Sequence, residues 1–291
     1  GFWSARDALS ARGTMVIPGG GMSSRARLEL IQRTKATVLF CTPTYAIHLA
    51  DAAEEHRQSL HDNSIRTLIV AGEPGGSVSS IRERIENAWG ATVIDHAGAS
   101  EIGPWRYGDA SGRGLHVLES EFIAEFLKPP HDEPADSGEL AQLVLTALGR
   151  KGMPVIRYRT GDLVRPEWFG TQSKVEDSVQ ASPNRFVLLR GGVLGRADDM
   201  MVVRGVNIFP SSIDEIVRSF PEVVEYRMTV RKRGEMDDVS VEVEDRLHDA
   251  ERIAEELHMR LGLRVEVQCV PPMSLPRFEG KAKRFIDERK K

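Results

Sequence analysis

Apolar runs alternate with helical patterns along the first hundred residues. Near-continuous apolar segments predict strands at 14–17, 37–40, 65–71 and 91–95. Apolar residues at helical spacing predict helices at 22–33, from Thr42 onward, and at 77–89, where Thr42 suits the cap, Pro43 the first turn and Gly90 the end. This order predicts an α/β fold with a doubly wound parallel sheet. In such sheets ligands bind at the carboxyl ends of the strands.

The pattern changes after residue 114. Longer β segments, separated by turns rich in Pro, Asp and Gly, lie at 115–127, 139–148, 154–158 and 185–189. They predict an antiparallel, barrel-like subdomain. The irregular polar stretch at 164–184 is interpreted as a surface loop.

A third pattern begins near residue 200. A strand at 200–203, a helix from Ser211 or Ser212 to Phe220, a hairpin through Gly234, a helix at 249–261 and a strand at 264–270 follow one another. Ser212 and Glu215 have the spacing of a capping box. The βαββαβ order predicts a small ferredoxin-like α+β domain. We therefore expect a large domain over 1–196 and a mobile small domain over 197–291.

Composition excludes several classes of protein. The 291 residues are 41% hydrophobic and 28% charged, which is ordinary for a soluble globular protein of about two domains. A net charge of -4 gives no reason to expect nucleic acid as a partner. No apolar run reaches the roughly 20 residues that span a bilayer, so no membrane association is expected. Cys41 and Cys269 match no zinc or redox spacing and are interpreted as buried free thiols in a reducing cytoplasm.

Charged residues cluster between the two predicted domains, in the stretch 194–210. Arg196, Asp198, Asp199 and Arg204 flank one short apolar strand. A packed core rarely needs two adjacent carboxylates and two arginines there, whereas a pivot that absorbs backbone changes accommodates them.

Two further polar segments could carry chemistry. In Gly161-Asp162, glycine gives the backbone freedom to turn a carboxylate into a cleft, where it can accept both hydroxyls of a ribose. A plain Gly-Asp turn explains the same residues. Glu101 could likewise be the first-turn carboxylate of a helix, and His96 an ordinary histidine at the end of a strand.

Taken together, these segments resemble the motifs of adenylate-forming enzymes, the acyl-CoA ligase superfamily. Residues 157–163 resemble its Tyr-Arg-Thr-Gly-Asp motif, and 96–101 resemble its aromatic-x-x-(Ser/Thr)-Glu motif with a histidine in the aromatic position. Residues 194–210 resemble its hinge, and their Asn-Ile-Phe-Pro ending is similar to the phenylacetate-CoA ligase branch. The resemblance implies that Asp162 and Arg196 contact the nucleotide ribose.

The same resemblance implies a role for each of several other residues. Asp198 would be the hinge, and Glu101 would coordinate Mg²⁺ beside the phosphates of ATP. The further implied nucleotide contacts are Glu73, Pro74, His96, Ala97 and Ser100, and the implied acyl pocket is Tyr45, Gly72, Ala97 and Gly98. An ordinary βα turn at 72–76 and a capped core helix after Thr42 explain two of these segments equally well.

The basic C-terminal segment contains the last candidate. Residues 276–284 resemble the catalytic-lysine loop of the superfamily, and Lys281 follows a glycine as in that loop, with Lys283 as the alternative. Lys281 would bridge the acid's carboxylate and the α-phosphate of ATP. Arg204 and Gly205 would line the channel for coenzyme A.

The resemblance thus implies AMP-forming ligation of an aromatic, phenylacetate-like acid to coenzyme A, with ATP, Mg²⁺ and CoA as cofactors. Loading of a carrier protein's phosphopantetheine is an alternative acceptor, and a homodimer is an open possibility. The phosphate loop of the superfamily has no counterpart in residues 1–291. We therefore expect an N-terminal portion of the large domain to be missing, so an inert adenylate-binding fragment is a further alternative.

Overall fold

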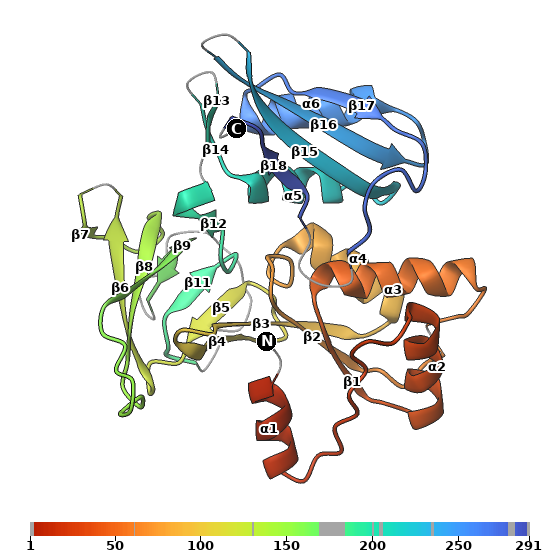
Figure 1. Cartoon of the computed structure of the whole chain (residues 1–291). Helices are drawn as coiled ribbons and strands as arrows, with labels where there is room; N and C mark the ends of the chain where they lie inside the picture. The colour runs from red at the N-terminus through yellow and green to blue at the C-terminus, as the bar shows by residue number, and fades with distance from the viewer. Residues whose placement is uncertain are drawn as a thin grey trace. The chain divides into compact units, whose positions relative to one another are not determined.

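The structure, a computed structural model, describes residues 3–60, 62–129, 131–168, 184–199, 201–203, 206–233, 236–278 and 283–289. The chain divides into two compact units, Gly1–Val193 and Leu194–Lys291. Figure 1 shows the elements of each unit. The division falls close to the expected boundary after residue 196.

The N-terminal unit contains the expected parallel strands and their connecting helices. These elements are β1 (Val38–Cys41), α3 (Pro43–Glu55), β2 (Thr67–Val70), α4 (Ser79–Trp89) and β3 (Thr92–Ala99). The three strands pair in parallel in the order β1-β2-β3. Thr42 caps α3 by accepting a hydrogen bond from the backbone of Tyr45, and Gly90 ends α4 in the left-handed conformation. The sequence predictions for these elements are confirmed, except that β3 continues beyond the expected strand end at residue 95 as far as Ala99.

Helices α3 and α4 pack with α2 (Ser24–Thr34) against this part of the sheet. Leu28, Leu49, Ile85 and Val93 belong to one buried apolar cluster, which contains residues from all three helices and from the strands. A doubly wound sheet has helices on both of its faces, whereas these helices share a single cluster. The doubly wound arrangement therefore stays a prediction. The strand expected at 14–17 is wrong, since these residues lie outside any strand and the side chain of Met15 is 77% exposed.

The sheet continues beyond β3 with antiparallel strands. They are β4 (Gly103–Gly108), β5 (Gly114–Val117), β11 (Leu188–Arg190) and β10 (Pro166–Glu167), in the order β3-β4-β5-β11-β10. An amphipathic helix, α1 (Trp3–Ala11), precedes the sheet and was not expected from the sequence. Most of its described side chains are exposed, so it carries little of the apolar periodicity on which helix prediction depends.

A second antiparallel sheet follows in the same unit. Its strands are β6 (Phe122–Lys128), β7 (Glu133–Pro134), β8 (Ala141–Ala147) and β9 (Tyr158–Val164), paired in the order β9-β8-β6-β7. Trp105, Leu143 and Leu189 share one buried cluster that joins this sheet to β4, β5 and β11. The strand expected at 154–158 is wrong in its bounds, because pairing with β8 begins at Tyr158 and extends through the Thr-Gly-Asp residues.

The C-terminal unit contains two helices against a four-stranded sheet (Figure 1). Its elements are β12 (Gly195–Arg196), a 3-10 turn (Ala197–Asp199), β13 (Met201–Val203), β14 (Val206–Ile208), α5 (Pro210–Arg218), β15 (Val223–Arg233), β16 (Met236–Asp245), α6 (Ala250–Leu261), β17 (Glu266–Cys269) and β18 (Phe285–Asp287). The sheet order is β17-β16-β15-β18. Ile213, Met228, Val241 and Leu257 are buried in its core.

Two details of this unit differ from the sequence prediction. The first expected strand, β13, pairs with β14 in a hairpin, and β18 occupies the place beside β15. The helix begins at Pro210 with Phe209 as its N-cap and no side-chain cap, so the capping box of Ser212 and Glu215 is wrong. A proline in the first turn lacks the N–H that a cap would satisfy, which explains the earlier start.

Cys41 is buried and Cys269 is half-buried, and both thiols are free. Burial raises the pKa of the Cys41 thiol to about 12, with the nearby charge of Glu73 acting in the same direction. Among the described residues, no helix combines the length and apolar character needed to cross a membrane.

Candidate nucleotide and acyl site

The β3–β4 hairpin carries most of the residues that the sequence singled out. His96, Ala97 and Gly98 lie in β3, which extends beyond the turn expected at 96 and ends at Ala99. A β-carbon on Gly98 would lie 2.9 Å from the carbonyl oxygen of Gly103, so the close pairing of β3 with β4 requires glycine at this position.

Ser100 and Glu101 lie in the turn after β3, and both are exposed. An exposed carboxylate beside a hydroxyl is a suitable donor set for Mg²⁺, which usually binds one or two carboxylates together with substrate phosphates. The described residues contain no group of three or more His, Cys, Asp or Glu side chains placed to hold a metal ion. The role of Glu101 as a metal ligand stays a prediction.

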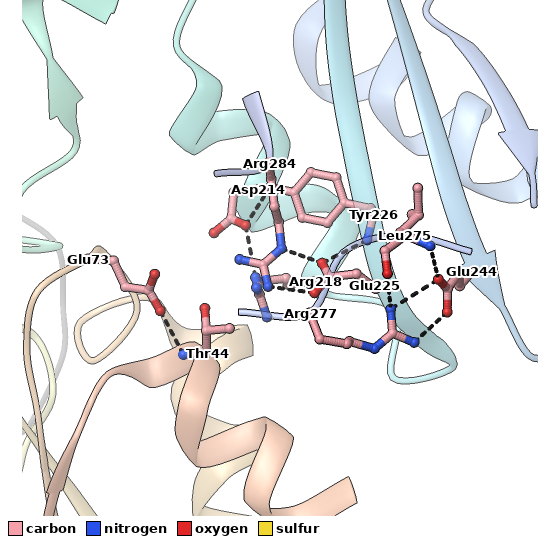
Figure 2. Close-up of polar contacts among 10 residues, drawn as sticks. All are labelled: Thr44, Glu73, Asp214, Arg218, Glu225, Tyr226, Glu244, Leu275, Arg277 and Arg284. Carbon is pink, nitrogen blue, oxygen red and sulfur yellow. Dashed lines mark hydrogen bonds and ion pairs between the residues drawn. The ribbon is translucent and has the colours of Figure 1, made fainter. Parts of the chain in front are cut away.

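The loop after β2 is attached to the start of α3. The backbone N–H of Thr44 donates a 2.7 Å hydrogen bond to the carboxylate of Glu73 (Figure 2). A β-carbon on Gly75 would lie 2.6 Å from Cβ of Pro43, so the loop and the helix start touch through backbone and ring. Gly72 has φ of +99°, a conformation that favours glycine. The predicted adenine loop and the predicted acyl-side helix thus meet at the carboxyl edge of β1 and β2.

Tyr45, one of the predicted pocket residues, lies mainly in the core. Its side chain is 5% exposed. Its hydroxyl lies 3.2 Å from Oγ of Ser24, and the guanidinium of Arg27 lies 4.6 Å from the ring centroid. Tyr45 is held firmly by these contacts, and its role in the acyl pocket stays a prediction.

Asp162 is presented by a bulge in β9. The pairing of β8 with β9 shifts register between Gln142 and Val144, and Gly161 has φ of +76° in the irregular segment. Thr160 stabilises this bend, because its hydroxyl donates to the carbonyl of Leu143 at 3.0 Å and accepts from the backbone N–H of Asp162 at 3.0 Å. Bulges of this kind re-aim a side chain. The sequence predicted a turn after a strand, whereas the structure places Asp162 inside one.

Buried polar residues that the sequence analysis missed connect Asp162 to the hairpin. Arg106 of β4 lies 3.6 Å from the Asp162 carboxylate (Nη1 to Oδ2). Asp95 of β3 accepts a 2.5 Å hydrogen bond from the hydroxyl of Ser77. The signal that could have revealed Asp95 is its charge, because it lies directly before His96 in an otherwise apolar strand.

Burial shifts the pKa values of this group. It raises the pKa of Asp95, against opposing hydrogen bonds from Ser77 and the charge of Arg106. It lowers the pKa of Arg106 to about 10, although the carboxylates of Asp162 and Asp95 oppose the shift. It also lowers the pKa of His96, and the charge of Arg106 adds to that effect. Arg106 is therefore charged at neutral pH.

The C-terminal unit holds the remaining predicted residues. Arg196 is exposed in β12, and the backbone of Asp198 lies in the 3-10 turn. The side chain of Asp198 lies outside the described residues. Three other predicted residues, Arg204, Gly205 and Lys281, also lie outside them. The alternative lysine, Lys283, is exposed.

Two ion pairs, one partly buried and one buried, lie on either side of residues 279–282 in the sequence (Figure 2). Before them, Arg277 donates to both oxygens of Glu244, at 3.0 and 2.6 Å. After them, Arg284 donates to both oxygens of Glu225, one of these bonds being 2.9 Å long. Burial alone would raise the pKa of Glu244, but the hydrogen bonds from Arg277 and from the backbone of Leu275 and Met273 outweigh it and lower the pKa.

Comparison with known proteins places this geometry in a family. Residues 205–289 match the AMP-binding enzyme C-terminal domain. The phenylacetate-coenzyme A ligase of Thermus thermophilus is 32% identical over 96% of this chain and 66% of its own length. The corresponding ligase of Escherichia coli strain K12 is 30% identical over 95% of this chain and 64% of its own length.

Solved structures agree. A 2-hydroxyisobutyryl-CoA ligase in the postadenylation state, in complex with an acyl-AMP, superimposes with a TM-score of 0.82 at 29% identity. The match covers 94% of this chain and 59% of that one. A benzoate CoA ligase from Burkholderia xenovorans LB400 shares the fold, with a TM-score of 0.66 at 17% identity over 93% of this chain and 55% of that one.

The chain therefore belongs to the adenylate-forming superfamily of acyl-CoA synthetases and ligases. Within that superfamily it belongs to the phenylacetate-CoA ligase-like branch, in agreement with the resemblance found in the sequence. The chain spans between 63% and 66% of the length of the phenylacetate-CoA ligases that it matches.

Proposed function

We propose that the protein activates an aromatic, phenylacetate-like carboxylic acid with ATP and transfers the acyl group to coenzyme A. In the first half-reaction the acid's carboxylate attacks the α-phosphorus of ATP, which forms an acyl-adenylate and releases pyrophosphate. In the second, the thiol of coenzyme A attacks the acyl carbon, which forms a thioester and releases AMP. The observation that carries the proposal is the bulge that presents Asp162 beside a hairpin bearing Ser100 and Glu101.

The proposed nucleotide contacts are the residues that the resemblance to the superfamily singles out. A carboxylate on a strand bulge can accept both hydroxyls of a ribose, and this is the role of Asp162. Glu73 and Pro74 flank the adenine, while His96 and Ala97 lie along the strand that passes it. Arg196 supplies a second ribose contact from the C-terminal unit. The fixed backbone of the 72–76 loop supports this assignment, because Glu73 is already oriented by Thr44.

Mg²⁺ is part of the proposal. Glu101, which is exposed in the turn after β3, would hold the ion together with the nucleotide phosphates. The ion would neutralise negative charge on the phosphates as the acid's carboxylate approaches. Ser100 lies next to Glu101 and would donate a hydrogen bond to a phosphate oxygen.

The C-terminal unit supplies the remaining groups. Lys281 would bridge the acid's carboxylate and the α-phosphate, and a cation there stabilises charge that develops during adenylation. Asp198 is the hinge residue about which the unit turns between half-reactions. Arg204 and Gly205 would line the channel for coenzyme A. The 2-hydroxyisobutyryl-CoA ligase has been solved in a postadenylation state and, with CoA, in a thioesterification state, which supports a two-step cycle.

The acid is aromatic by analogy with relatives named for phenylacetate. Its ring would lie over Ala97 and Gly98, where a small side chain and a glycine leave an open strand surface. Tyr45 and Gly72 complete the proposed pocket.

Isotope exchange between pyrophosphate and ATP, measured with a panel of aromatic acids, tests this function. We expect exchange that depends on an arylacetic acid and thioester formation when coenzyme A is added. A protein that exchanges with these acids but acylates only a phosphopantetheine carrier would overturn the assignment of coenzyme A. Absence of exchange with every acid would overturn the proposal as a whole.

A further inference from the structure

Buried polar side chains from three elements meet behind the proposed ribose contact. Ser77, Asp95 and Arg106 are each 8% exposed. They come from the loop before α4, from β3 and from β4. Ser77 donates a hydrogen bond to Asp95, and Nη1 of Arg106 lies 3.6 Å from Oδ2 of Asp162. The charges of Asp95 and Arg106 also act on each other.

The neighbouring backbone is built closely around this group. A β-carbon on Gly76 would lie 2.7 Å from Cβ of Asp95, and one on Gly108 would lie 2.8 Å from the carbonyl oxygen of Asp95. The guanidinium of Arg106 lies 3.9 Å from the ring centroid of Trp105, which is itself buried. The group therefore has little room to rearrange.

Arg106 carries a charge in a position where charge is expensive. Its Nε and Nη1 atoms are buried and donate no hydrogen bond to any residue that the structure describes. Burying a charged group costs free energy unless partners compensate for it, and a packed apolar residue of similar volume is often as stable. An apolar residue in place of Arg106 could not supply the positive charge beside Asp162.

We propose that Arg106 is a positioning residue, which holds the Asp162 carboxylate aimed at the ribose hydroxyls of the nucleotide, while Asp95, fixed by its hydrogen bond from Ser77, acts on Arg106 through charge. This inference rests on the proposed function. At 3.6 Å, Nη1 of Arg106 acts on Oδ2 of Asp162 through charge and not through a hydrogen bond.

The inference predicts that Arg106 affects the ribose and no other part of ATP. Kinetics and calorimetry with ATP or AMP, and with their 2′-deoxy and 3′-deoxy analogues, measure this directly. We expect Asp162→Asn to weaken the preference for ribose about tenfold or more, which is the factor that corresponds to one good polar contact. Arg106→Met should weaken it to a similar extent, mainly through KM, and Arg106→Lys should restore part of it.

A double-mutant cycle separates positioning from general damage. If Arg106 acts through Asp162, then Arg106→Met has little further effect on ribose preference once Asp162→Asn is present. Arg82→Met is the matched control, because Arg82 is buried in the same unit but hydrogen-bonds to Glu86 and the carbonyl of Ala110. It should lower the melting temperature without changing ribose preference.

A second readout does not depend on the nucleotide. Because the charge of Arg106 contributes to the low pKa of His96, removing that charge should raise the pKa of His96 in an NMR titration. If Arg106→Met fails to fold, Asp95→Asn gives the same tests with the guanidinium retained, and we expect a smaller loss of ribose preference.

The outcomes distinguish this inference from the proposed function. Equal losses with ribose and deoxyribose nucleotides, or additive effects of Arg106→Met and Asp162→Asn, would overturn the positioning role even if exchange activity is intact. AMP calorimetry applies to the protein whether or not it turns over, so a ribose preference lost in Arg106→Met supports the inference even where exchange fails. A wild-type protein that does not bind AMP overturns both.

Discussion

At the scale of single residues, the site depends on backbone conformations that only a few residue types accept. Gly161 takes φ of +76°, and the hydroxyl of Thr160 is bonded on both sides of the bend. Asp162 is therefore placed by its neighbours before any ligand arrives, which reduces the conformational entropy lost on binding.

Lys281 gives the sharpest test at this scale. Its substitution by alanine should abolish adenylation, since no other cationic side chain is assigned to bridge the acid's carboxylate and the α-phosphate, and should leave thioester formation from supplied acyl-adenylate largely intact. Lys283→Ala is the control, because Lys283 is the exposed alternative. Separate assays of the two half-reactions decide the point, and equal losses in both for Lys281→Ala would refute its role.

His96 links the site to pH. Its pKa lies below the ordinary 6.5 because of burial first and the charge of Arg106 second, so the folded protein binds its proton less readily than the unfolded chain. The contribution of neutral His96 to the free energy of unfolding is fully present above pH 6.5. It is lost as the pH falls below 6.5 toward the pKa of His96 in the folded protein. Urea unfolding at several pH values should show this loss, and His96→Gln should reduce the slope. An unchanged slope would contradict it.

At the scale of elements, the start of α3 connects the loops at the carboxyl edge of the sheet. The hydroxyl of Thr42 caps the helix by accepting a 3.2 Å hydrogen bond from the backbone N–H of Tyr45. The carboxylate of Glu73, in the loop after β2, accepts a hydrogen bond from the backbone N–H of Thr44. The two contacts stabilise the same helix end but belong to different parts of the site.

Substitutions of Thr42 and Glu73 should therefore have different effects on stability and on nucleotide affinity. Thr42→Ala should lower the free energy of unfolding by about 1 kcal/mol, the usual effect of losing a cap, and leave nucleotide affinity nearly unchanged. Glu73→Gln keeps an acceptor for Thr44 and should weaken adenine binding more than it lowers stability. Thermal unfolding and AMP calorimetry on both variants make the comparison, and a larger affinity loss in Thr42→Ala would contradict it.

The elements also show what a sequence can and cannot reveal. Strands β1 to β3 and helices α3, α4 and α6 were predictable, because their apolar periodicity and caps are local signals. The bulge at Gly161 and the pairing of β18 with β15 were not, since they depend on the register of distant strands. Asp162 could be named because residues 157–163 resemble a motif of the superfamily. Arg106 and Asp95 could not, because only the fold brings them together.

At the scale of the whole molecule, two compact units share one proposed reaction. Residues assigned to nucleotide and acid lie mostly in the first unit, and the assigned lysine and CoA channel lie in the second. A two-step cycle therefore requires that the hinge at Asp198 allow each set of groups to act in turn.

Asp198→Pro tests that requirement. Proline fixes φ near −65° and removes the backbone N–H, so it restricts the rotation that a hinge must undergo. One half-reaction should then be slowed far more than the other, as single-turnover assays of adenylation and thioester formation would reveal. A uniform reduction of both would argue against a pivot at this residue.

The central claim is that the protein forms an acyl-adenylate from an arylacetic acid. The most direct measurement is exchange of labelled pyrophosphate into ATP, with and without phenylacetate and without coenzyme A. The account predicts exchange that requires the acid and Mg²⁺ and that Lys281→Ala eliminates. Exchange that is absent with every acid, or that proceeds equally without one, would contradict it.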